Sequence, residues 1–148
     1  MRLPRDFEDY LKQGIAKKIS PDRSRAFYLV EESQNSLYAL NEIIRKIGIN
    51  NKNANALIKE SYDIIMELIR AKMFLDGFSA SGNFAHEAEI SYLKKLNFSK
   101  NEISFLNELR FFRNSVTYYG KILDQDYAKK VIDFLYFAHP KLKNKINE

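Results

Sequence analysis

The chain has 148 residues, a formal net charge of +5 and no cysteine. This length suits one domain, and the content of 45% hydrophobic residues allows a core without a metal or a disulfide. The lack of cysteine excludes disulfides, thiolate catalysis and cysteine-ligated zinc. The sequence contains no apolar run long enough to span a membrane, and its charged N-terminus does not resemble a signal peptide. We therefore predict a cytoplasmic protein, whose mild basic surplus permits contact with phosphate but does not establish it.

Glycine and proline are rare, and they fall where helices should begin or end. Ser20, Pro21 and Asp22 suit the start of a long helix, as the N-cap, the first helical residue and an acid at the positive end of the helix dipole. Apolar residues then recur at helical spacing as far as Gly48, which suits a C-terminal stop. A shorter amphipathic segment over residues 4–18 precedes this helix.

More helices are expected along the middle of the chain. Apolar spacing predicts a second long helix over residues 53–76. Composition predicts a loop over residues 78–83 and a short helix over residues 84–96. Ser99 and Glu102 then form a capping box, in which each side chain accepts a hydrogen bond from the backbone of the other. This box predicts the start of a fourth helix.

The last helix is expected to begin near Asp124, and the tail from Lys141 to Glu148 is expected to fray because lysine and asparagine dominate it. No segment alternates for long enough to predict a β-strand. We therefore predict an all-α fold, an up-and-down antiparallel bundle of four to five helices plus a short N-terminal helix. It forms one domain over residues 1–148, with a core at about residues 20–140.

The motifs of several enzyme classes are missing from the sequence. Neither of the common glycine-rich phosphate-binding loops occurs. His86 and His139 are far apart and lack metal-ligand spacing, so we predict no metal and no cofactor, and we interpret each histidine as a surface or packing residue. The serines have no histidine base nearby in the sequence, so an acyl-transfer triad has no support.

A polar stripe at the end of the fourth helix is the most informative pattern in the chain. Four polar residues share one face at helical spacing, namely Arg110, Arg113, Asn114 and Thr117. An apolar stripe runs beside them, formed by Phe112, Val116 and Tyr119. An arginine–asparagine pair among aromatic residues is costly to bury without partners. Something must therefore compensate this pair.

Three interpretations of the stripe stay open. In the first, Arg110 and Arg113 pair with acids such as Glu108 or with a neighbouring helix, while Asn114 bonds locally. In the second, a two-fold axis joins two stripes into a positively charged cleft. In the third, that cleft holds a phosphate of RNA or of a nucleotide, because guanidinium groups bind phosphate in a bidentate manner and aromatic side chains stack on bases. The predicted ligands of that phosphate are Arg110, Arg113, Thr117 and Tyr119.

The segment from Arg113 to Tyr118 (RNSVTY) resembles the signature of HEPN domains. These are small all-α bundles, commonly dimeric, that occur in prokaryotic toxin–antitoxin and defence systems. Their signature is an arginine, usually followed by a polar residue, and then a histidine after four to six intervening residues. Residues 25–29 and 62–78 resemble the first two core helices of the family, and residues 79–86 resemble the loop between helices. The resemblance covers roughly residues 20–140.

In catalytic members of that family, the arginine and histidine of two protomers form a composite, metal-independent ribonuclease site. By this resemblance Arg113 and Asn114 match the family residues, whereas Tyr118 stands where the histidine is expected. Histidine titrates near pH 6.5 but tyrosine near 10, so Tyr118 is a poor base. An alternative is that His86 folds back to take the place of this histidine, although nothing in the spacing shows it.

The resemblance therefore implies a homodimeric module that binds RNA or a nucleotide phosphate and has weak or lost ribonuclease activity. One alternative is an active ribonuclease of a toxin or defence system, with Arg113, Asn114 and Tyr118 as catalytic residues. The other alternative is a bundle that pairs with a small nucleotidyltransferase, as the resemblance implies for many members.

Overall fold

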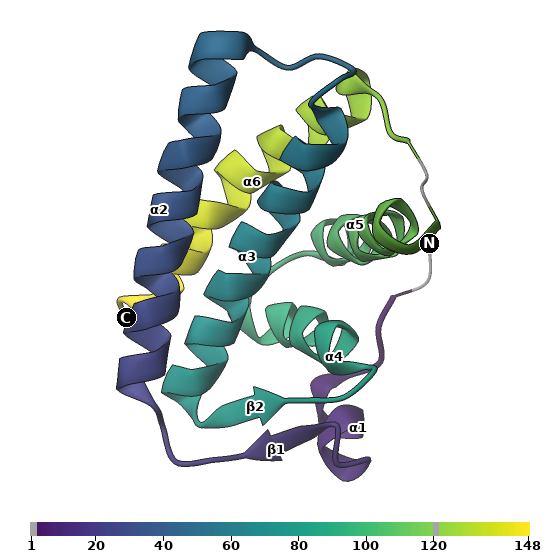
Figure 1. Cartoon of the computed structure of the whole chain (residues 1–148). Coiled ribbons are helices and arrows are strands. Elements are labelled where there is room, and N and C mark those ends of the chain that lie inside the picture. The colour runs from purple at the N-terminus through teal and green to yellow at the C-terminus, as the bar shows by residue number, and fades with distance from the viewer. Residues whose placement is uncertain (1–2, 120–121) are drawn as a thin grey trace.

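A computed structural model describes the backbone of residues 3–119 and 122–148, and the side chains of residues 3–114 and 122–148. It confirms the predicted all-α helical bundle, to which a small two-stranded sheet is added (Figure 1). In chain order the elements are α1 (Phe7–Lys12), β1 (Ala16–Lys18), α2 (Arg23–Ile47), α3 (Ala54–Asp76), β2 (Phe78–Ala80), α4 (Ala85–Ser91), a 3-10 helix η1 (Tyr92–Leu96), α5 (Lys100–Tyr119) and α6 (Gln125–Ile146).

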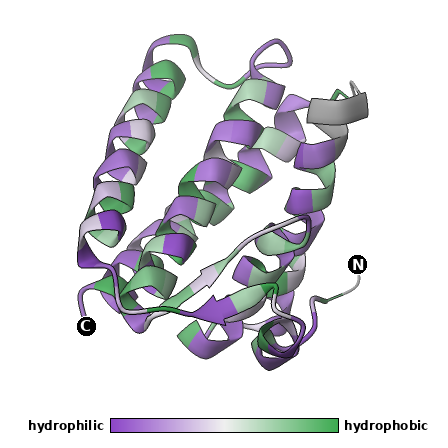
Figure 2. Ribbon diagram, turned by 60° about the horizontal axis from the view of Figure 1, so that its bottom comes forward, coloured by the Kyte–Doolittle hydropathy of each residue, from purple (hydrophilic) through white to green (hydrophobic). Residues whose placement is uncertain are grey.

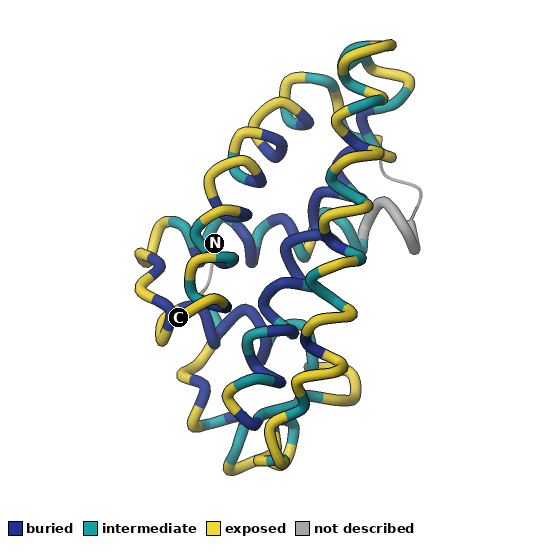
Figure 3. Tube along the Cα trace, turned by 90° about the vertical axis from the view of Figure 1, so that its left-hand side faces the viewer, coloured by how far each residue is buried: buried dark blue, intermediate teal, exposed yellow. Residues whose placement is uncertain are grey.

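Helix α3 is the centre of the bundle, because thirteen of its 23 residues are buried. It packs against the long helices α2 and α6, and against the shorter α4 and α5 (Figure 1). Its sequence is apolar over much of its circumference, which is the pattern of a helix that other helices surround. Buried segments accordingly lie on the inner sides of the helices, and exposed segments lie on the outer turns (Figure 3).

Polar residues on α3 follow one stripe, at Asp63, Glu67 and Arg70, and all three are half-buried. The spacing of four and three residues places them on one face of the helix. Hydropathy in Figure 2 shows this mixture of apolar and polar segments along the helices of the bundle. The two ends of this stripe form ion pairs with neighbouring helices, Asp63 with α5 and Arg70 with α4.

The two strands were not predicted, and the expectation of a loop over residues 78–83 is wrong at its first three positions. Strands β1 and β2 pair in antiparallel fashion, with Lys17 opposite Ser79. A ladder of three residues is too short to show an alternating sequence pattern, and the partners come from distant parts of the chain. The sheet ties the N-terminal segment to the end of α3.

Other boundaries correct the expectations from the sequence. The N-cap of α2 is Asp22 rather than Ser20, because the Asp22 side chain accepts a hydrogen bond of 3.0 Å from the backbone N–H of Arg25. The tail does not fray at Lys141, since α6 continues to Ile146, whose side chain is buried in the core. Among the described residues, no helix has both the length and the apolar character needed to cross a membrane.

Candidate functional site

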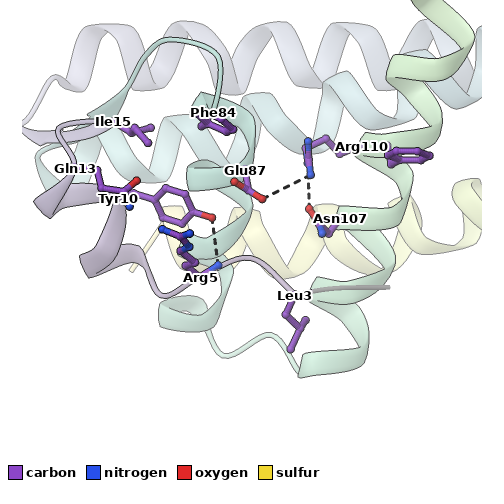
Figure 4. Close-up of a pocket in the computed structure, with 10 residues that line it drawn as sticks. Leu3, Arg5, Tyr10, Gln13, Ile15, Phe84, Glu87, Asn107 and Arg110 are labelled. Atoms are coloured by element: carbon purple, nitrogen blue, oxygen red, sulfur yellow. Dashed lines mark hydrogen bonds and ion pairs between the residues drawn. The ribbon is translucent and has the colours of Figure 1, made fainter. Parts of the chain in front are cut away.

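The polar stripe of α5 faces two neighbouring helices. Arg113 Nη2 lies 3.4 Å from Asp63 Oδ1 on α3, and Arg110 Nη2 lies 3.8 Å from Glu87 Oε1 on α4. Arg110 Nε also donates a hydrogen bond of 3.1 Å to Asn107 Oδ1, one turn earlier on α5 (Figure 4). The first interpretation is therefore right that these arginines pair with acids, but the acids are those of α3 and α4 and not Glu108.

The guanidinium of Arg113 is only partly compensated. Its side chain is 24% exposed, and its ion pair with Asp63 is long and half-exposed on the acidic side. Its buried Nε atom has no hydrogen-bond partner within the part of the chain that the structure describes. Such a buried donor is costly to leave unpaired, so this position has unused capacity to bind an anion.

His86 on α4 lies within the electrostatic reach of Arg113. The Tyr62 hydroxyl, fully buried on α3, is 3.1 Å from His86 Nδ1. Burial lowers the pKa of His86, and the charges of Arg70 and Arg113 lower it further, whereas Glu89 raises it. The imidazole is therefore largely neutral at pH 7, held by a hydroxyl that can either donate to Nδ1 or accept from it.

Sequence reasoning missed this arrangement. His86 was interpreted as a surface or packing residue, because its distance from Arg113 along the chain gives no hint of contact. The packing of α4 against both α3 and α5 brings His86 close enough for the charge of Arg113 to lower its pKa. Only the resemblance of residues 79–86 to a loop between two core helices hinted that His86 lies next to the site.

The other end of the α3 stripe anchors α4. Arg70 donates two hydrogen bonds to Glu89, with Nε to Oε2 at 2.7 Å and Nη2 to Oε1 at 3.0 Å. Glu89 is 2% exposed, so this paired geometry is the compensation that a buried carboxylate requires. One helical turn back on α3, burial raises the pKa of Glu67 to about 7, and the negative charges of Glu60 and Asp63 add to the rise.

The remaining predicted ligands divide into two groups. Asn114 is half-buried beside Arg113 on α5. The side chains of Thr117, Tyr118 and Tyr119 lie outside the described residues, so the structure does not test their predicted roles. Across the described ranges, no group of three or more histidine, aspartate and glutamate side chains is arranged to hold a metal ion.

Comparisons with known proteins add no relative to this description. No family model matches the chain, and neither a curated protein nor a solved structure does. The arrangement can therefore be judged only by its own chemistry. It combines two arginines, a neutral histidine, a buried tyrosine hydroxyl and two weakly held carboxylates between α3, α4 and α5.

Proposed function

We propose that this protein is a HEPN-like module that binds RNA or a nucleotide through its phosphate, at the polar site between α3, α4 and α5. The observation that carries the proposal is the state of Arg113, with one long ion pair and a buried Nε that has no partner among the described residues. A phosphate offers several acceptor oxygens, so it can bond to the partly exposed guanidinium of Arg113, and a small shift of that side chain would also bring Nε into the bidentate contact typical of arginine.

Asp63 competes with such a phosphate, but only weakly. The pair is 3.4 Å long and Asp63 is 42% exposed, so water screens the attraction. Exposed pairs of this kind contribute between about 0 and 1 kcal/mol to stability. Arg110 lies three residues from Arg113 on the same face, and its pair with Glu87 is longer still. A phosphate group of RNA or of a nucleotide can therefore displace both carboxylates at little cost.

We further propose that two copies join at this face, as the resemblance implies. Two large apolar side chains are exposed beside Arg110 and Glu87 of this site, namely Phe84 and Phe111. Exposed apolar residues gathered at one site favour an interface, and a two-fold axis would place two phosphate sites in one cleft. Light scattering during gel filtration is expected to show a dimer at micromolar concentration, and a monomer under these conditions would remove this part of the proposal.

Metal-independent ribonuclease activity is a second candidate, and the position of His86 favours it. Histidine is the side chain best suited to accept the proton of a 2′-hydroxyl near pH 7. As the 2′-oxygen bonds to phosphorus, the bond from phosphorus to the 5′-oxygen breaks and that oxygen takes a proton from solvent water, while Arg113 would stabilise the charge on the phosphate. The nucleotidyltransferase partner, the toxin–antitoxin role and the cytoplasmic location stay predictions from the sequence.

The decisive experiment compares RNA binding by the wild-type chain with two single variants. Arg113→Ala removes the proposed phosphate ligand, whereas Arg45→Ala removes the same charge from the exposed surface of α2. We expect Arg113→Ala to weaken binding about tenfold and to reduce the dependence on salt by about one counterion. Equal losses in both variants would show that binding follows net charge and would overturn the proposal.

A cleavage assay separates the two candidate functions. RNA is incubated with wild-type protein and with His86→Ala in the presence of a chelator, and products are examined for a 2′,3′-cyclic phosphate. Activity that disappears in His86→Ala while RNA binding persists supports the ribonuclease. No cleavage by the wild-type protein, with binding that depends on Arg113, supports the binding module.

A further inference from the structure

A pocket of about 360 Å³ opens next to Arg110 (Figure 4). Its volume lies within the range of small-molecule sites. Three parts of the chain form it: the N-terminal segment with Arg5 and Tyr10, the start of α4 with Phe84 and Glu87, and α5 with Arg110. The N-terminal segment lies outside the region that resembles HEPN domains, so the pocket is a feature of this chain rather than of that resemblance.

The charges in the pocket favour an anion. Two arginines, Arg5 and Arg110, and one acid, Glu87, line it, which leaves one positive charge in surplus. Glu87 reaches Arg110 only at 3.8 Å, so the pairing within the pocket is loose. Arg5 is exposed, and only its backbone N–H bonds within the pocket, to the Tyr10 hydroxyl at 3.2 Å. The exposed guanidinium of Arg5 is therefore open to a phosphate, whereas Arg110 would exchange its loose pair with Glu87 for one.

The walls of the pocket favour a flat ring. Phe84, the N-cap residue of α4, is 58% exposed and lines the pocket, so its ring is open to a ligand. Ile15 and Leu3 add apolar surface, and Figure 4 shows Phe84 and Ile15 on one side of the opening. Burial raises the pKa of Tyr10 to about 12, so its hydroxyl stays protonated, while Glu87 accepts hydrogen bonds.

We propose that this pocket holds the base of a nucleotide, stacked on Phe84, while Arg110 and Arg5 bind the phosphate of the same nucleotide. The proposal rests on the proposed function, because Arg110 is common to the pocket and to the phosphate site of Arg113. It adds the ligand class, a base joined to a phosphate, supplied either as a free mononucleotide or as one unit of a single-stranded RNA. Glu87 is placed to accept hydrogen bonds from N–H groups on the edge of the base.

The test uses the full chain and four probes, namely AMP, GMP, ribose 5-phosphate and a six-nucleotide RNA, in titration calorimetry. The first two carry a base and a phosphate, whereas ribose 5-phosphate carries the phosphate alone. We expect the mononucleotides to bind about tenfold more tightly than ribose 5-phosphate, as stacking of one base on an aromatic ring predicts. Equal affinities for these probes would overturn the proposal.

Two variants and one control assign the contacts. Phe84→Ala is expected to weaken the binding of mononucleotides or of RNA about tenfold and to leave ribose 5-phosphate unchanged. The matched control is Phe27→Ala, which removes a ring of similar exposure, 54%, from α2 and should change nothing. Arg5→Glu should weaken all phosphate probes about tenfold. If Phe84→Ala and Phe27→Ala behave alike with every probe, the pocket does not bind a base.

The outcomes also separate this proposal from the proposed function. RNA binding that depends on Arg113 but not on Phe84 would refute the pocket and keep the phosphate site. Mononucleotide binding that depends on Phe84, without any binding of RNA, would keep the pocket with free nucleotides as its ligands and refute the RNA-binding function. Loss of binding in both Arg113→Ala and Phe84→Ala, with RNA as the probe, supports both.

Discussion

Two arginine–carboxylate pairs connect α3 to its neighbours. They differ in the number and length of their hydrogen bonds and in the burial of the acid. Arg70 and Glu89 share two short hydrogen bonds in a buried setting. Arg113 and Asp63 share one contact of 3.4 Å, with Asp63 open to solvent. The first pair satisfies its acid and holds α4 to α3. Among the described residues, the second leaves Nε of its guanidinium without a partner, which is the property expected of a ligand-binding arginine rather than of a structural one.

The comparison shows why charge pairing alone does not identify a functional residue. Both arginines are half-buried and both have an acidic partner on the other side of a helix interface. They are distinguished by the number of donors that the partner satisfies and by the burial of the acid. The following predictions use these differences, beginning with the largest expected effect.

Replacing the acid of the buried Arg70–Glu89 pair should cause the largest loss of stability. Glu89→Gln leaves Arg70 without its counter-charge in a buried site, so we expect a loss of about 3 kcal/mol in the free energy of unfolding. The equivalent Asp63→Asn should cost less than about 1 kcal/mol, because the side chain of that acid is 42% exposed and water screens its charge. Urea denaturation of both variants measures the difference. Similar losses would mean that the two pairs have the same structural role.

Replacing the acid of the Arg113–Asp63 pair should instead change the affinity for RNA. Asp63→Asn removes the carboxylate that competes with phosphate for Arg113, so RNA affinity should rise about fivefold at low salt and less at high salt. Asp133→Asn, which removes an exposed acid from α6, is the matched control for net charge. Filter binding at two salt concentrations measures the effect. A rise of the same size in the control would assign it to long-range charge.

The hydrogen bond between Tyr62 and His86 should contribute a smaller amount to stability. Tyr62→Phe removes the buried hydroxyl while keeping the ring in the core, so we expect a loss of about 1 kcal/mol in urea denaturation. Tyr10→Phe supplies a comparison, because that hydroxyl also bonds within the protein, to the backbone of Arg5. No change in Tyr62→Phe would show that the bond does not hold His86 in place.

Glu67 should give the smallest effect, visible only in its dependence on pH. Its pKa in the folded protein is raised to about 7 from an ordinary value of 4.5, so the folded state holds a proton more strongly than the unfolded state. Wild-type stability is therefore expected to fall as pH rises from 4.5 to above 7. Glu67→Gln should be more stable than wild type at pH 8 by less than about 1 kcal/mol, and equal to it at pH 4. Thermal unfolding at the two pH values measures this.

Local signals in the sequence predicted the helices well. The capping box is present, since Glu102 accepts a bond of 2.8 Å from the Ser99 backbone and Ser99 Oγ accepts one of 3.2 Å in return. Gly48 and Gly77 end α2 and α3 as expected. The start of α2 was misplaced because the backbone N–H of Asp22 bonds to the carbonyl of Phe74, a contact between helices that no local rule contains.

The site was predictable only in part, because its members lie on different helices. Helical spacing identified Arg110 and Arg113 as neighbours on one face. Their partners Asp63 and Glu87, and the approach of His86, depend on how α3, α4 and α5 pack, which spacing along one helix does not contain. The residues that line the pocket are still further apart in sequence, since Arg5 and Tyr10 near the N-terminus lie opposite Arg110.

Gly77 fixes the N-terminal segment, which lines the pocket, to the end of α3. The residue adopts a left-handed backbone with φ of 87°, and an added Cβ would lie 2.9 Å from the carbonyl oxygen of Ile19. The close approach allows the Ile19 N–H to bond to the Gly77 carbonyl at 2.9 Å. A bulkier residue at position 77 would weaken this attachment of the N-terminal segment. It would thereby displace Arg5 and Tyr10, which line the pocket. If the proposed nucleotide binds in the pocket, amide exchange in the N-terminal segment should slow, because the bound molecule stabilises the wall that this segment forms.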